Sequence, residues 1–177
     1  MAGSLLFGSK DAEVGAILFT DFECPFCARL ADTVIPEFRR DYVDTGRVLL
    51  AIRHYPLDKH SNARGAAVLA ECFGRQGHFW PIHDVLFQAK GVVPETSLAS
   101  LAESLGVDPR ALSGCRANKA IADLITEHKK TADGLSVSGT PTMFIGRLSA
   151  ASAISVSDVI VGAQPASTFA SAVERLK

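Results

Sequence analysis

The sequence predicts an α/β fold in which a mixed sheet is divided by a large helical insertion. Two apolar runs, residues 14–23 and 47–55, flank a helical pattern, as in a strand–helix–strand unit. A long middle stretch, residues 58–134, shows helical patterns and no convincing strand. Two further strand patterns follow it, at residues 142–146 and 158–162.

The first helix is predicted at residues 24–42, between the two apolar runs. Pro36 is expected to kink it, because proline lacks the N–H that a helical hydrogen bond needs. A turn at residues 44–46 then leads into the second strand. Because a crossover helix joins the two strands, we expect them to be parallel.

The middle stretch predicts five helices. Gly106 fits the C-cap of the third, and Pro109 fits the first turn of the fourth. We therefore expect a sheet domain formed by residues 1–57 and 135–177, and an inserted helical domain formed by residues 58–134. The five helices are expected at residues 61–73, 78–89 and 94–105, from about residue 107 onward, and at 118–132.

The C-terminal part predicts two strands and a closing helix. Residues 148–157, between the strands, are small and polar and predict a mobile loop. The closing helix is expected at residues 167–176, with Phe169, Val173 and Leu176 turned toward the core.

Bulk properties limit the class of protein. The chain has 177 residues, of which 47% are hydrophobic, and this suits one domain, or one domain with an insertion. A formal net charge of -1 argues against nucleic-acid binding as the main function. The first residues lack the charged and apolar regions of a signal peptide. The expected location is therefore periplasmic or otherwise extracytoplasmic with a signal removed, or alternatively cytoplasmic.

The motif Cys24-Pro25-Phe26-Cys27 carries the strongest chemical signal. It follows the first predicted strand and opens the first predicted helix. Two thiols at this spacing can form a small disulfide ring, and helix N-terminal amides stabilise a thiolate on the first of them. A thiolate is the species that attacks a disulfide. The motif thus indicates redox chemistry in which Cys24 attacks and Cys27 resolves.

A zinc site is the alternative interpretation of two cysteines at this spacing. Such a site usually needs two more ligands, and a second motif of the same kind is absent from the sequence. His78 and His83 could in principle complete a site. The strand-then-helix context favours redox chemistry, so no metal is expected.

A second motif lies far downstream, where Thr140 and Pro141 precede the apolar run 143–145. Proline is tolerated at a strand start because it lacks the N–H that a central ladder would use. The bond before a proline can also be cis at modest cost. An ordinary trans loop proline is the alternative when this motif is taken singly.

Together, the two motifs resemble the DsbA-like branch of the thioredoxin superfamily. The pattern F-x-D-F-x-C-P-F-C is followed at a distance by G-T-P-T-x-F-I. The resemblance runs from about Glu13 to the C-terminus, and it implies a thioredoxin-like fold with a mixed central sheet and an inserted helical domain. Segments at residues 44–48, 55–60, 76–80 and 162–165 also look like that family.

The resemblance implies a role for each site residue. The first cysteine is the nucleophile, and the second resolves the mixed disulfide. The proline is cis beside the disulfide, and the backbone before it pairs with an extended substrate segment. The cofactor is the redox-active disulfide alone. The implied catalytic residues are Cys24 and Cys27, and the implied substrate-binding residues are Thr140, Pro141, Pro25 and Phe26.

The activity implied is protein thiol–disulfide exchange, with oxidation of reduced protein substrates as the favoured direction. Reduction of protein disulfides is the first alternative, because a motif does not reveal a redox potential. A glutathione-dependent isomerase or transferase on the same fold is the second alternative. The family resemblance also implies reoxidation by a quinone-linked membrane partner.

Cys72 and Cys115 are the remaining cysteines, and each lies in a helical pattern of the insertion. Some DsbA-like relatives carry a structural disulfide in their helical region, so the resemblance implies a Cys72–Cys115 bridge. Two buried free thiols are the alternative, since cysteine packs well as a small hydrophobe.

Two residues near the motif, Phe26 and Leu18, depart from the patterns of related proteins, and two nearby carboxylates need an assignment. Phe26 stands where many DsbA relatives carry histidine, so we expect a thiol less acidic than theirs. Leu18 stands where thioredoxins keep a buried acid. Asp21 and Glu23 are expected to be solvated carboxylates at the strand end, with a proton-handling or substrate-facing role as the alternative. Cys24 is expected to be exposed with a depressed pKa, and Cys27 to be more buried.

Overall fold

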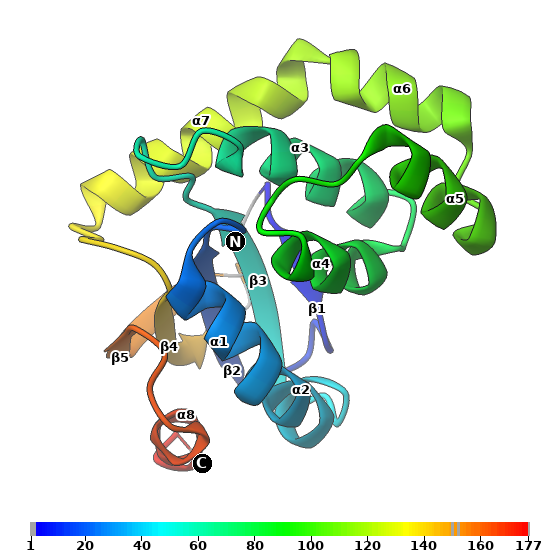
Figure 1. Cartoon of the computed structure of the whole chain (residues 1–177). Coiled ribbons are helices and arrows are strands. Elements are labelled where there is room, and N and C mark those ends of the chain that lie inside the picture. Colours follow the sequence, from blue (N-terminus) through cyan, green and yellow to red (C-terminus); the bar gives the residue numbers. More distant parts are fainter. Residues whose placement is uncertain (1–2, 150, 152, 177) are drawn as a thin grey trace.

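The fold is built on a five-stranded sheet with strand order β1-β3-β2-β4-β5 (Figure 1). The computed structural model describes residues 3–149, 151 and 153–176. β2 and β3 are parallel, and the other neighbouring pairs are antiparallel. The predicted α/β class and mixed sheet are therefore confirmed. The strands are β1 (Leu5–Phe7), β2 (Val14–Thr20), β3 (Val48–His54), β4 (Thr142–Leu148) and β5 (Ile154–Val161).

Three helices lie over one face of this sheet (Figure 1). Leu18 of β2 and Met143 of β4 belong to the same buried core as Phe169 of the closing helix. Val173 and Leu176 are buried with Phe169, as the helical pattern predicts. The helices are α1 (Pro25–Thr33), α2 (Ile35–Phe38) and α8 (Ala166–Glu174).

The first predicted helix is broken close to the proline that was expected to kink it. α1 ends at Thr33, α2 begins at Ile35, and a short π-helix follows at Arg39–Val43. Pro36 has no N–H to donate to the carbonyl four residues earlier, so the helical ladder loses a bond there. The wider π-helical turn then completes the segment before β3.

The middle stretch consists of helices joined by turns and loops, and within its described residues it contains no strand. Gly106 takes the left-handed conformation with φ 68° at the end of α5, as expected of a C-cap. Asp108 and Asn118 cap the next two helices through their side chains. None of the described helices could span a bilayer. The helices are α3 (Ala63–Gly74), α4 (Phe79–Gln88), α5 (Glu95–Leu105), α6 (Pro109–Ala117) and α7 (Lys119–Gly134).

A buried polar cluster joins this helical layer to the sheet. His54 of β3 places Nε2 3.3 Å from Oε1 of Glu71 in α3. The backbone N–H of His54 donates to Nδ1 of His128 in α7 at 3.3 Å. All three side chains are buried. Burial, helped by the nearby His54, lowers the pKa of His128 to about 4, so its ring is neutral at pH 7.

The predicted loop at residues 148–157 is wrong at Leu148 and at residues 154–157, which lie in strands, while residues 150 and 152 lie outside the described residues. β4 continues to Leu148, and β5 begins at Ile154, which pairs with it. β5 is an edge strand with many exposed side chains, so it lacks the apolar pattern that reveals a buried strand. Gly146 sits at a bulge in this ladder, where a Cβ atom would lie 2.0 Å from the Ser155 carbonyl oxygen.

The short strand β1 is absent from the sequence-based prediction. It covers three residues and pairs antiparallel with β3, with Leu6 opposite Ala51. Three residues are too few to show a period of two. The strand forms because β3 would otherwise have an unpaired edge.

A disulfide joins Cys72 of α3 to Cys115 of α6, with an S–S distance of 2.02 Å. Cys72 is fully buried, and the two cysteines are 43 residues apart in sequence. The bond encloses α4 and α5 in a covalent loop. It therefore fixes the outer helices of the insertion to α3, the helix that contacts the sheet through Glu71.

We expect the double substitution Cys72→Ala and Cys115→Ala to lower the free energy of unfolding by about 2–4 kcal/mol. The unfolded chain regains the entropy of a closed loop, and that entropy is of this order for a 43-residue separation. Urea unfolding followed by circular dichroism measures the change. Reductant should destabilise the parent protein but not the variant, and equal stability of the two without reductant would contradict a stabilising bridge.

Candidate active site

The motif Cys24–Cys27 lies at the junction between β2 and α1. β2 ends at Thr20, and a turn follows in which the Cys24 N–H donates to the Asp21 carbonyl at 3.1 Å. Cys24 is the N-cap of α1 in an extended conformation, and Pro25 opens the helix. The first cysteine therefore lies where the unpaired amides of a helix start gather.

The second motif lies directly against the first. The Thr140–Pro141 peptide bond is cis and leads into β4. The Cys24 thiol donates to the Thr140 carbonyl oxygen at 3.3 Å across 116 residues of sequence. The Thr140 hydroxyl is buried with no partner in this thiol form. It is thus an available donor once Cys24 becomes a thiolate.

The surroundings of Cys24 favour its ionised form. A hydrogen bond from the Cys27 thiol is the main cause, and it lowers the pKa of Cys24 to about 5 against the opposing effect of burial. The Thr140 hydroxyl and the backbone N–H groups of Cys27 and Phe26 lower it further. Cys24 is therefore a thiolate at neutral pH.

Cys27 is in the opposite situation. It is 1% exposed, and burial is the main cause that raises its pKa well above the ordinary value. The adjacent Cys24 raises it further through its charge and hydrogen bond, against smaller contributions from Thr140 and Thr20. The predicted deeper burial of Cys27 matches this placement. The two sulfurs thus divide into one stable thiolate and one thiol that holds its proton.

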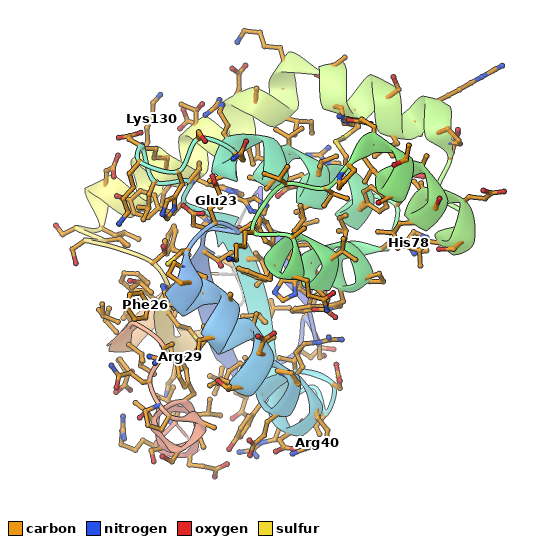
Figure 2. The ribbon with its side chains drawn as sticks, in the orientation of Figure 1. Glu23, Phe26, Arg29, Arg40, His78 and Lys130 are labelled. Atoms are coloured by element: carbon orange, nitrogen blue, oxygen red, sulfur yellow. A yellow bond between two sulfur atoms is a disulfide. The ribbon has the colours of Figure 1, made fainter. Side chains whose placement is uncertain are left out.

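The expected exposure of Cys24 is wrong, since the residue is only 4% exposed. The cis-proline loop covers it through the contact with Thr140. The exposed part of the motif is instead Pro25 and Phe26, and the Phe26 side chain is 54% exposed. Figure 2 shows Phe26 at the start of α1, with Arg29 further along the helix. The guanidinium carbon of Arg29 lies 5.5 Å from the centroid of the Phe26 ring.

Asp21 is not the solvated carboxylate that its place at a strand end predicts. It is 2% exposed and accepts hydrogen bonds from the backbone N–H groups of Glu23 and Leu57, both at 2.8 Å. The ring of His60 lies 2.8 Å from the same carboxylate. The signal in the sequence is an acid enclosed by the aromatic residues of an apolar run. Asp21 therefore fixes the turn that presents Cys24.

Glu23 makes a second connection from this turn to the segment that follows β3. Its carboxylate accepts the Asn62 backbone N–H at 2.6 Å and the Asn62 side-chain amide at 3.1 Å. Glu23 is only partly buried, so the sequence-based expectation of a solvated group holds better for it than for Asp21. The turn before the motif is thus held from both of its ends.

The two histidines considered as metal ligands have other surroundings. His78 is the N-cap of α4, and His83 is buried against the rings of Trp80 and Phe87. Across the described ranges, no three His, Cys, Asp or Glu side chains are grouped so that they could hold a metal ion. The arrangement suits sulfur exchange at Cys24.

Comparison with known proteins places the chain in a family. Residues 2–159 match the family model described as Thioredoxin, so the chain belongs to that family. A relative named Na⁺/H⁺ antiporter NhaA 1, from Salinispora arenicola, is 37% identical over 139 residues. That match covers 78% of this chain and 21% of the antiporter. The chain thus spans about a fifth of the length of this curated relative.

Solved structures identify the branch of the family. Wolbachia pipientis α-DsbA1 superposes with a TM-score of 0.83 at 24% identity, covering 99% of this chain and 92% of that one. Pseudomonas aeruginosa DsbA2 superposes with a TM-score of 0.73 at 26% sequence identity, and the match covers 98% of this chain and 94% of that one. A periplasmic thioredoxin-like protein from Salmonella enterica superposes with a TM-score of 0.74 at 22% sequence identity, and the match covers 98% of this chain and 90% of that one. The chain thus has the DsbA-like form of the thioredoxin fold.

We expect Cys27→Ala to raise the pKa of Cys24 by roughly one pH unit or more, because it removes the main hydrogen-bond donor to the thiolate. Cys27→Ser is the matched control, since its hydroxyl keeps a donor at that place. Thiolate absorbance at 240 nm against pH measures both variants. Equal pKa values in the two variants would show that Cys27 does not stabilise the thiolate.

Proposed function

We propose that this protein oxidises reduced protein substrates by donating a Cys24–Cys27 disulfide. The observation that supports the proposal most strongly is the opposite ionisation of the two sulfurs. Cys24 has its pKa lowered to about 5, while that of Cys27 is raised well above its ordinary value. The DsbA-like fold and the contact between Cys24 and the cis-proline loop support the same assignment.

The reaction exchanges one disulfide for another. A substrate thiolate attacks the Cys24 sulfur, the Cys24–Cys27 bond breaks, and Cys27 leaves and takes up a proton. A second substrate thiolate then attacks the substrate sulfur of the mixed disulfide, and Cys24 leaves as a thiolate. Two electrons pass from the substrate dithiol to the protein, which ends with two reduced cysteines.

The ionisation pattern favours this direction over reduction. A thiol of low pKa is the better leaving group, so substrate attack on the mixed disulfide expels Cys24 readily. Return attack by Cys27 needs a thiolate that its buried site disfavours. A stabilised thiolate also favours the reduced form of the protein, and this makes its disulfide a stronger oxidant.

The sign of the pH dependence follows from the lowered pKa. The Cys24 thiolate stabilises the reduced protein fully above the pKa of free cysteine, which is about 8.5. This stabilisation falls as the pH decreases, and it is lost as the pH passes through about 5. As the pH falls from about 8.5 to about 5, the reduced form should therefore lose the stability that it gains over the oxidised form from the Cys24 thiolate.

The exposed surface around the motif would receive the substrate. We assign pairing with an extended substrate segment to the backbone at Thr140, as in the family that the chain resembles. Pro25 and Phe26 form the apolar rim on the other side. We therefore assign catalysis to Cys24 and Cys27. We assign substrate contact to Thr140, Pro141, Pro25 and Phe26.

Reoxidation completes the cycle, and we assign it to a quinone-linked membrane protein, as in the family that the chain resembles. The Cys72–Cys115 bond is of a kind that persists in oxidising compartments. This bond favours a periplasmic or other extracytoplasmic location over the cytoplasm.

We expect the oxidised protein to convert a reduced, unfolded substrate protein to its disulfide form, and Cys24→Ser to abolish this activity. Cys27→Ser cannot form the disulfide, so it should also fail to oxidise the reduced substrate. With glutathione disulfide, its Cys24 thiolate should displace one glutathione and stop at a mixed disulfide, because no second thiol remains to displace the other. Mass spectrometry after acid quenching detects that species. If the Cys24–Cys27 pair of the parent protein does not exchange with glutathione at any ratio of reduced to oxidised glutathione, the proposed function is contradicted.

We also expect Phe26→His to raise the reduction potential, because an imidazolium beside Cys24 stabilises the thiolate and hence the reduced form. Phe26→Leu is the control, since it keeps an apolar side chain. Equilibration with glutathione buffers gives both potentials. An unchanged or lower potential in the histidine variant would refute the prediction that Phe26 makes the protein less oxidising.

A further inference from the structure

The edge strand β5 carries a row of exposed valines. Val156, Val159 and Val161 are 48%, 51% and 52% exposed. They lie opposite Gly146, Phe144 and Thr142 of β4, in that order. The bulge between the first two pairs adds one residue, and this keeps all three valines on the same face despite their uneven spacing.

This valine row extends a buried apolar cluster on the sheet face opposite α8. Phe144, directly across from Val159, packs with Phe19 and Val137 in that cluster. Asp158, the charged residue of β5, pairs instead with Arg175 just beyond α8. The valine side of β5 is therefore uncharged and suits an apolar partner.

The backbone of β5 is open to a further strand along this stretch, except that the Val161 carbonyl accepts the Gln164 side-chain N–H at 3.0 Å, a bond that an added strand would replace. The Gly162 N–H donates to the Pro141 carbonyl at 2.8 Å, which makes Val161 and Thr142 a non-hydrogen-bonded pair. By alternation, the N–H and C=O groups of Val159 and Val161 point away from β4. Within the part of the chain that the structure describes, no strand pairs with that side of β5.

Natural proteins usually protect such an edge with bulges and charged residues. In β5 the bulge lies between Val156 and Val159. It interrupts the pairing with β4 before the last three residues of β5, residues 159–161, so it does not protect them. The unprotected part is the end next to the redox site. Val161 lies opposite the residue that follows Pro141, and the preceding Thr140 contacts Cys24.

We propose that an extended, apolar and uncharged segment of the substrate protein adds to β5 as a further strand along Val159–Val161. The proposal rests on the proposed function and names the part of the substrate that the site prefers. An added strand lies about 5 Å from β5 and about 10 Å from β4. Roughly three extended residues span that distance, so the preferred apolar segment begins about three residues from the reacting cysteine.

The test compares two dithiol peptides with the same cysteines, one carrying valines and the other glutamates at the positions predicted to meet β5. The parent protein should oxidise the valine peptide with a higher kcat/KM. Val159→Asp with Val161→Asp should lower kcat/KM for the valine peptide at least fivefold and leave glutathione exchange unchanged. Val156→Asp, beyond the bulge, is the matched control and should retain the parent's preference.

A second measurement needs no variant. N-methylation of alternate amides in the valine peptide removes the donors that pair with β5 and should reduce its oxidation by the parent protein. Equal rates for the methylated and unmethylated peptides, or for the parent and the double variant, overturn the proposal. So does a dimer in light scattering that the double variant dissociates, because β5 then binds a second copy. Inert parent cysteines in the glutathione assay would instead refute the proposed function.

Discussion

The close approach of the Cys24 sulfur to the cis-proline loop at Thr140 is the contact on which the site depends. It joins the end of β2 to the start of β4, and these central strands can meet there because they pair antiparallel. The same contact covers the sulfur and places the Thr140 hydroxyl beside it. The sheet thus serves to hold one sulfur between a helix start and a cis-proline loop.

Most of the fold could be predicted from local patterns. The parallel strands and the helices of the insertion have continuous apolar runs or clear caps, as at Gly106 and Asn118. β5 could not be found over its first half, because an exposed edge strand has no buried face to impose alternation. β1 was missed because three residues carry no period.

The site was predictable as a set of residues but not as an environment. The spacing of Cys24 and Cys27 in a strand-then-helix context indicates redox chemistry without any structure. The burial of Cys24 and Asp21 depends on segments distant in sequence, namely the cis-proline loop and the residues after β3. The aromatic neighbours of Asp21 are a local signal of its burial, but local patterns do not show which distant segments cover either side chain, so both were expected to be more exposed than they are.

The His54–Glu71–His128 cluster has a mechanical consequence. It attaches α3 and α7 to the sheet, while the Cys72–Cys115 bond attaches α6 to α3. The helical layer is therefore held to the sheet through α3 and α7, and the disulfide extends this attachment from α3 to α6 within the layer. Under the proposed function, a helical layer attached in this way leaves most of the conformational adaptation to the substrate polypeptide.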